Sequence, residues 1–98
     1  MIDAAQVTHD PDRRRFEYQS GGRTALLAYR IRDGRMIVLH TEVPAELAGH
    51  GLGGQLVQAA VAYAAREGLA VVPLCPFTES WLGRHPDVAA QVRIDEFR

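Results

Sequence analysis

Lysine is absent from this 98-residue chain, and all 11 of its basic residues are arginine. A Walker-type phosphate-binding loop needs a lysine after its second glycine, so that class of nucleotide-binding protein is excluded. The single cysteine, Cys75, cannot form an internal disulfide, which argues against a secreted disulfide scaffold. No apolar run approaches the ~20 residues of a membrane-spanning helix, and the polar N-terminus is not typical of a signal peptide. We therefore expect a cytoplasmic protein that does not insert into a membrane.

Net charge is also low. The formal net charge is -1, which gives no electrostatic reason to bind nucleic acid or an anionic membrane. Hydrophobic residues make up 47% of the chain and charged residues 23%, as is usual for a globular domain. The length predicts one domain, residues 1–98, and we find no internal repeat or linker.

The first half of the chain alternates apolar and polar residues, which is typical of half-buried strands. Two dipeptides suited to tight hairpin turns, Gly21-Gly22 and Asp33-Gly34, interrupt this alternation. The pattern predicts an antiparallel meander of three strands at residues 14–20, 23–32 and 35–43. Residues 1–13 show no such alternation, and we expect them to be irregular.

The second half changes to a helical period. Apolar residues spaced by four predict a helix from Leu52 that ends at Gly68. A short apolar strand at 69–74 and a second helix at 76–85 follow, and Val88, Val92 and Ile94 of the tail are expected to dock on the core. A strand, a helix and a strand in succession predict a right-handed crossover, with the last strand parallel to the third.

Four glycines fall within the six positions from Gly49 to Gly54, immediately before and within the start of the long helix. Gly49, Gly51 and Gly54 match the dinucleotide fingerprint G-x-G-x-x-G, but five residues separate them from the preceding strand. The next strand, LAVVPLC, also lacks the acidic residue that would bind a ribose. The context therefore argues against a dinucleotide-binding fold.

A simpler anion site fits the glycine cluster better. The first turn of a helix has unpaired backbone amides and a partial positive charge, and nearby glycines let a pyrophosphate approach without steric clash. The alternative is a flexible loop with a glycine cap that binds nothing. The sequence favours the anion site and leaves this alternative open.

The stretch HTEVPAELAGHGLGGQLVQAAVAYAAREGLAVVPLCPF resembles the small, single-domain branch of the GCN5-related N-acetyltransferase superfamily. The resemblance implies a reduced α/β acetyltransferase fold, with a meander, a crossover helix, one parallel strand and a short terminal helix. It also implies that acetyl-CoA is the cosubstrate. Leu47 and Ala48 stand where the superfamily often has Gln or Arg, so one side-chain contact is expected to be missing. The resemblance also implies that backbone groups of two segments bind CoA. The pyrophosphate is expected to bind to Gly49, His50, Gly51, Leu52, Gly53 and Gly54. The pantetheine arm is expected to bind to Thr41, Glu42 and Val43.

Cys75 and His40 are the candidate catalytic residues. Alternation along the third strand predicts that His40 shares a face with Val38 and Glu42, and parallel neighbouring strands would place Cys75 near the same end of the sheet. From spacing alone, a buried structural cysteine and a hydrogen-bonded histidine are the commoner interpretations. The resemblance implies instead that these two residues form a catalytic pair.

The leading functional hypothesis is transfer of an acetyl group from acetyl-CoA to an unidentified amine. Either His40 acts as a general base for direct attack, or Cys75 is transiently acetylated. The chief alternative is a CoA-binding module that acts as a sensor or interaction partner without significant transferase activity. No histidine has metal-ligand spacing with another candidate ligand, so we expect no metal site.

Overall fold

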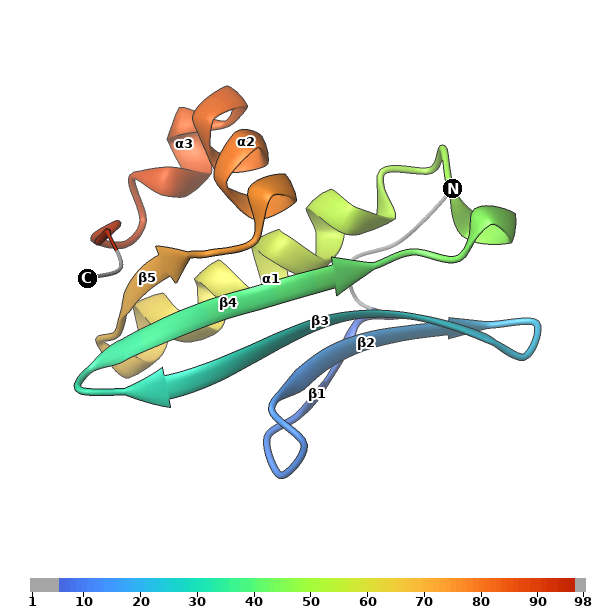
Figure 1. The fold of residues 1–98 in the computed structure, drawn as a ribbon, viewed down its shortest axis with the longest axis horizontal. Helices are drawn as coiled ribbons and strands as arrows, with labels where there is room; N and C mark the ends of the chain where they lie inside the picture. Colours follow the sequence, from blue (N-terminus) through green and yellow to red (C-terminus); the bar gives the residue numbers. More distant parts are fainter. Residues whose placement is uncertain (1–5, 97–98) are drawn as a thin grey trace.

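The structure of the chain is a computed structural model that describes residues 6–96. Its centre is a five-stranded sheet in which the strands lie side by side in chain order (Figure 1). The first four strands are antiparallel, and the last runs parallel to the fourth. The strands are β1 (Thr8–Asp10), β2 (Arg15–Ser20), β3 (Arg23–Arg32), β4 (Arg35–Glu42) and β5 (Ala70–Pro73).

The helical segments lie after β4. The main helix packs behind the sheet in Figure 1, and the two short helices gather beside β5. A left-handed Gly68 ends the main helix, as its position in the sequence predicts. The segments are the 3-10 turn η2 (Ala45–Leu47) and the helices α1 (Leu52–Glu67), α2 (Pro76–Arg84) and α3 (Pro86–Ala89).

The predicted α/β meander with a crossover helix and a parallel last strand is confirmed, but the meander has one more strand than expected. Thr8–Asp10 pairs with residues 15–17 of β2, within a segment predicted to be irregular. His9 lies stacked on Phe16, with ring centroids 4.2 Å apart. A strand of three residues is too short to show alternation, so its tertiary contacts decide its conformation.

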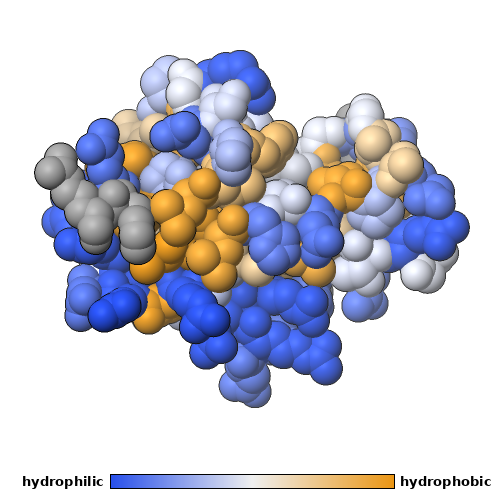
Figure 2. Space-filling model, viewed as in Figure 1, coloured by the Kyte–Doolittle hydropathy of each residue, from blue (hydrophilic) through white to orange (hydrophobic). Residues whose placement is uncertain are grey.

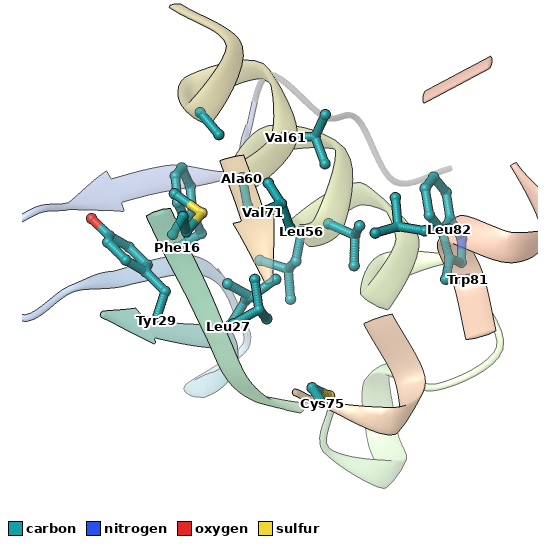
Figure 3. Close-up of a cluster of buried hydrophobic side chains, with 14 of the residues drawn as sticks. Phe16, Leu27, Tyr29, Leu56, Ala60, Val61, Val71, Cys75, Trp81 and Leu82 are labelled. Carbon is teal, nitrogen blue, oxygen red and sulfur yellow. The ribbon is translucent and has the colours of Figure 1, made fainter. Parts of the chain in front are cut away.

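The core lies between the sheet and α1. Buried side chains from the strands, among them Phe16, Leu27 and Tyr29, face Leu56 and Ala60 of α1 (Figure 3). Trp81 and Leu82 of α2 extend the same cluster, and Cys75 lies in it too. Burial of these apolar surfaces supplies most of the driving force for the fold.

Two irregularities in β4 shape the sheet. Tyr29 pairs with Val38 and Ala28 with His40, so Leu39 has no partner on β3 and forms a β-bulge. On its other side, β4 pairs with β5 only as far as Val38 and Pro73. Beyond that pair β4 continues to Glu42 without β5, and we call this divergence the fork.

The C-terminal tail covers the outer edge of β5. Ile94 bridges Val71 in parallel, with the Val71 amide donating to the carbonyl of Arg93 and the Asp95 amide donating to the carbonyl of Val71. Val88 is buried at 8% exposure and Val92 is partly buried, as predicted for a docked tail. Ile94 is 41% exposed and contributes backbone pairing rather than core packing.

Candidate active site

The fork leaves one edge of β4 without a strand partner. Thr41 and Glu42 pair with Leu27 and Leu26 of β3 on one side, whereas no strand in the described part of the chain pairs with them on the side of β5. Val43 continues directly from them. These are the residues expected to contact the pantetheine arm, and an unpaired strand edge is a suitable place for a ligand amide to add.

The glycine loop delivers exposed amides at the start of α1. Gly51 caps the helix in the left-handed conformation, with φ 73°, and Gly49 has φ 85°. A residue with a Cβ is strained in this region, so these two positions favour glycine. The first helical bond runs from the Gln55 amide to the Gly51 carbonyl. Within residues 6–96 the amides of Leu52, Gly53 and Gly54 have no hydrogen-bond partner, as is usual for a first turn.

A cavity of about 310 Å³ opens beside these amides. The glycine loop forms one wall, and Phe77 and Trp81 of α2 form another. Val43, at the end of β4, also lines it, so the cavity reaches from the start of α1 to the end of the fork. We call this space the loop cavity. It is the groove that an anion bound at the helix start would need for the rest of a long ligand.

Gly53 and Gly54 have a packing role that the sequence did not reveal. A Cβ on Gly53 would lie 2.7 Å from the ring of Phe77, and one on Gly54 would lie 2.5 Å from Nε1 of Trp81. Their lack of side chains therefore lets the aromatic residues of α2 pack on the first turn of α1. Gly53 and Gly54 therefore contribute to helix packing, independently of any ligand that the loop binds.

Cys75 lies just below the fork, on the core face of the sheet. It is 4% exposed, and its amide donates to the Val38 carbonyl at 3.1 Å. It is also the N-cap of α2, and its Sγ lies 3.7 Å from Oγ1 of Thr41. Burial by itself raises the pKa of the Cys75 thiol. Hydrogen bonds from the Thr78 and Phe77 amides and the Thr41 hydroxyl, together with the nearby Thr78 hydroxyl, outweigh burial and hold that pKa below its ordinary value.

Thr78 is a site residue that sequence reasoning missed. It is 1% exposed, and its Oγ1 makes no hydrogen bond of good geometry to any other described residue. The hydroxyl still lies close enough to the sulfur of Cys75 to favour the thiolate. The available signal was its position three residues after the N-cap, where a side chain returns to the start of the helix.

His40 lies on the opposite face from the one that contains Cys75. Because Leu39 is bulged, His40 pairs with Ala28, whereas Val38 pairs with the buried Tyr29. The prediction that His40 shares a face with Val38 is therefore wrong. The prediction that it shares a face with Glu42 is confirmed, since the two side chains approach to 3.4 Å. His40 and Cys75 lie at the same end of the sheet, but no hydrogen bond joins them in the part of the chain described.

His50, a residue of the glycine loop, lies outside the loop cavity. His50 is exposed and does not line the loop cavity, so its backbone is the part nearest the proposed anion site. Among the described residues, no group of three or more His, Cys, Asp or Glu side chains is arranged to hold a metal ion. None of the helices in residues 6–96 is long and apolar enough to cross a membrane.

Comparison with known proteins agrees with this fold. Residues 15–92 match the family model described as GCN5-related N-acetyl-transferase. The chain therefore belongs to this family. A solution NMR structure of a GCN5-like protein from Staphylococcus aureus superposes with a TM-score of 0.72 at 22% identity, over 99% of this chain and 94% of that one. That likeness supports the fold alone, and no curated protein matches the chain.

Proposed function

We propose that this protein transfers an acetyl group from acetyl-CoA to an amine. The observation that carries the proposal is the loop cavity, which runs from the free amides of α1 to the end of the fork. A pyrophosphate on the amides of Leu52, Gly53 and Gly54 would let the pantetheine arm extend toward Thr41 and Val43. The thioester would then lie at the fork, close to Cys75.

The first test is binding. We expect acetyl-CoA and CoA to bind with measurable heat in isothermal titration calorimetry, and both to bind more tightly than pantetheine, which lacks the pyrophosphate and the adenosine. Absence of heat with both CoA ligands would reject the anion site. It would favour the interpretation of the glycines as a loop and packing feature only.

For the transfer step we propose direct attack. The amine nitrogen forms a bond to the thioester carbonyl carbon, the C–S bond breaks, and CoA leaves as the thiolate. His40 or a water that it polarises accepts the proton from the attacking nitrogen. Two observations support this route over an acetyl-cysteine. Cys75 is almost fully buried, and His40 lies on the face of the sheet opposite α1, which is free to receive a second substrate.

Replacement of Cys75 separates the two routes. We expect Cys75→Ala to slow CoA release in the presence of an amine roughly tenfold, because positioning supplies much of the acceleration and remains. Intact-mass spectrometry after mixing the enzyme with acetyl-CoA alone should show no acetylated protein. Complete loss of transfer in Cys75→Ala together with an acetyl adduct on wild type would establish the covalent route instead.

A CoA-binding module without transferase activity is the second candidate. The observation that favours it is the separation of His40 from Cys75 by the plane of the sheet, which leaves no preassembled catalytic pair. A panel of small amines, polyamines and peptides tests it by CoA release. Tight CoA binding with no amine-dependent release across the panel would favour the module over the enzyme.

A further inference from the structure

A second cavity lies on the face of the sheet opposite α1, which no helix within residues 6–96 covers. It has a volume of about 350 Å³, and we call it the outer cavity. In Figure 2 this face shows a hydrophobic patch over the region of β4, bordered by hydrophilic side chains. The lining residues are Arg14, Arg30, Ile31, Arg32, Ile37, Leu39 and Leu74.

The outer cavity reaches the fork from the side opposite α1. The last pair between β4 and β5 is Val38 with Pro73, and the next residue on each strand, Leu39 and Leu74, lines the cavity. Leu74 directly precedes Cys75, and the Leu39 bulge turns His40 toward this same face. A molecule in the outer cavity would therefore lie beside the point where the thioester is proposed to bind.

The charge of the outer cavity is one-sided. Of the described residues, three arginines line it and no acidic residue does. Arg14 and Arg30 take part in no ion pair within residues 6–96, and Arg32 approaches only Asp33, at 3.7 Å, where both side chains are about 80% exposed and the pair is weak. A neighbouring cavity lined by Glu79 and Asp95 differs, because Arg93 and Arg35 already pair with Asp95.

The opposite charge lies farther along β4 on the same face. Glu42 and His40 are adjacent there, and within residues 6–96 Glu42 forms an ion pair only with His40, when that ring is protonated. Ala28, which faces His40, and Arg30 are two residues apart on β3, or about 7 Å at ~3.4 Å per residue. The apolar side chain of Leu39 lies between these ends, and Ile37 lies beside Arg30 as its cross-strand partner. The face thus presents an acid at the fork, an apolar floor and then unmatched arginines.

Building on the proposed function, we infer that the acceptor is a small amine that carries a carboxylate across an apolar spacer. Its amine lies at the fork beside His40 and Glu42. Its spacer packs on Leu39 and Leu74, and its carboxylate binds Arg30 and Arg14. Arginine suits this role because its planar guanidinium donates two parallel hydrogen bonds to a carboxylate.

The test compares two amines that differ only in charge at the far end. 6-Aminohexanoate and 6-aminohexanamide have the same length and the same amine, so the ratio of their kcat/KM values isolates the carboxylate. We expect a ratio of at least tenfold in favour of 6-aminohexanoate. We expect Arg30→Gln to bring the ratio close to one, and Arg13→Gln, which removes a neighbouring arginine outside the cavity, to leave the ratio as in wild type.

Failure of this inference is distinct from failure of the proposed function. Equal kcat/KM values for the two amines, with CoA release intact, would overturn the inference and leave the transferase standing. If no amine releases CoA, the proposed function fails. NMR titration with 6-aminohexanoate then still tests whether the outer cavity binds an amine that carries a carboxylate. Shifts at Ile37, Leu39 and Leu74 that require Arg30 would support it. Absence of such shifts, or a dimer in sedimentation that buries this face, would overturn it.

Discussion

Gly54 lies directly under the indole of Trp81, and this contact ties the start of α1 to α2. The same turn offers the free amides of the proposed anion site. One short stretch of glycine therefore meets two demands: close approach of a neighbouring helix, and an open path to backbone donors. A side chain at Gly54 would meet the rigid indole ring rather than a flexible chain end.

Gly54→Ala tests the packing demand. The added Cβ would lie 2.5 Å from Trp81 Nε1, so we expect the free energy of unfolding to fall by about 1–3 kcal/mol, the usual effect of overpacking. Urea denaturation measures this. Gly83→Ala is the matched control, because its Cβ would meet nothing within 4 Å, and it should leave stability equal or raise it by about 0.5–1 kcal/mol. Equal stability of the two variants would contradict the contact.

Thr41 joins the fork to Cys75. Its hydroxyl and the donors of α2 lower the pKa of the thiol against the opposing effect of burial, so a larger fraction is thiolate at neutral pH. In Thr41→Val one of these donors is lost, and the pKa of Cys75 should rise. We expect the midpoint of the pH profile of iodoacetamide alkylation to move to higher pH, with a several-fold slower rate at neutral pH. Thr24→Val, on β3 and without contact to Cys75, should keep the wild-type profile.

At the scale of elements, β4 is the strand on which the site depends. Its first half pairs on both sides, and its second half pairs only with β3. The Leu39 bulge lies near the start of this second half and turns His40 to the uncovered face. Bulges are common near active sites because they change which way a side chain points. The fork and the bulge together give the same strand one side proposed for the cofactor and another proposed for the acceptor.

The glycine loop can be tested at its N-cap. An L-residue in the left-handed region costs about 1–2 kcal/mol, so in Gly51→Ala the loop should relax and displace the amides of the first turn. We expect the Kd for acetyl-CoA to rise at least fivefold in calorimetry. Gly34→Ala introduces the same strain at φ 73° in the turn between β3 and β4. Weaker binding in both variants alike would indicate general destabilisation rather than a role of the loop in binding.

At the scale of the whole molecule, a cluster of aromatic side chains around His9 packs β1 against the sheet and α1. His9 stacks on Phe16, meets Tyr63 of α1 edge-on with ring centroids 4.4 Å apart, and hydrogen-bonds to the Tyr29 hydroxyl. The cluster thus joins β1, β2, β3 and α1. Burial, and then the charge of Arg66, lower the pKa of His9, and Asp10 opposes them only in part.

This lowered pKa predicts how stability depends on pH. The unfolded chain protonates His9 near pH 6.5, whereas the folded chain resists protonation to lower pH. The contribution of neutral His9 is therefore complete above pH 6.5 and is lost as the pH falls through the lower, folded value. We expect the Tm to fall more steeply between pH 6.5 and 5 in wild type than in His9→Gln. His50→Gln, at an exposed position, should retain the wild-type slope.

The order of elements and the family could be predicted from the sequence because both depend on local patterns. Alternation, two tight turns and a helical period define β2 to β5 and α1, and the glycines mark the start of α1. The two backbone segments of the candidate site, Thr41–Val43 and Gly49–Gly54, could be located from the sequence. Local patterns mark both the end of a strand and a glycine loop. Their roles in binding remain predictions.

Tertiary structure alone decided on which face of the sheet His40 and Glu42 lie relative to the core. A one-residue bulge reverses alternation, and nothing local at Leu39 distinguishes it from a regular strand residue, so the face of His40 could not be predicted. Three other features depend on residues that are distant in the chain or on separate turns. They are the burial of Thr78, the contact of Trp81 with Gly54, and the position of Arg14 near Arg30 in one cavity. Local sequence determines periodicity, whereas register and packing depend on the whole chain, and the chemistry of this site depends on register and packing.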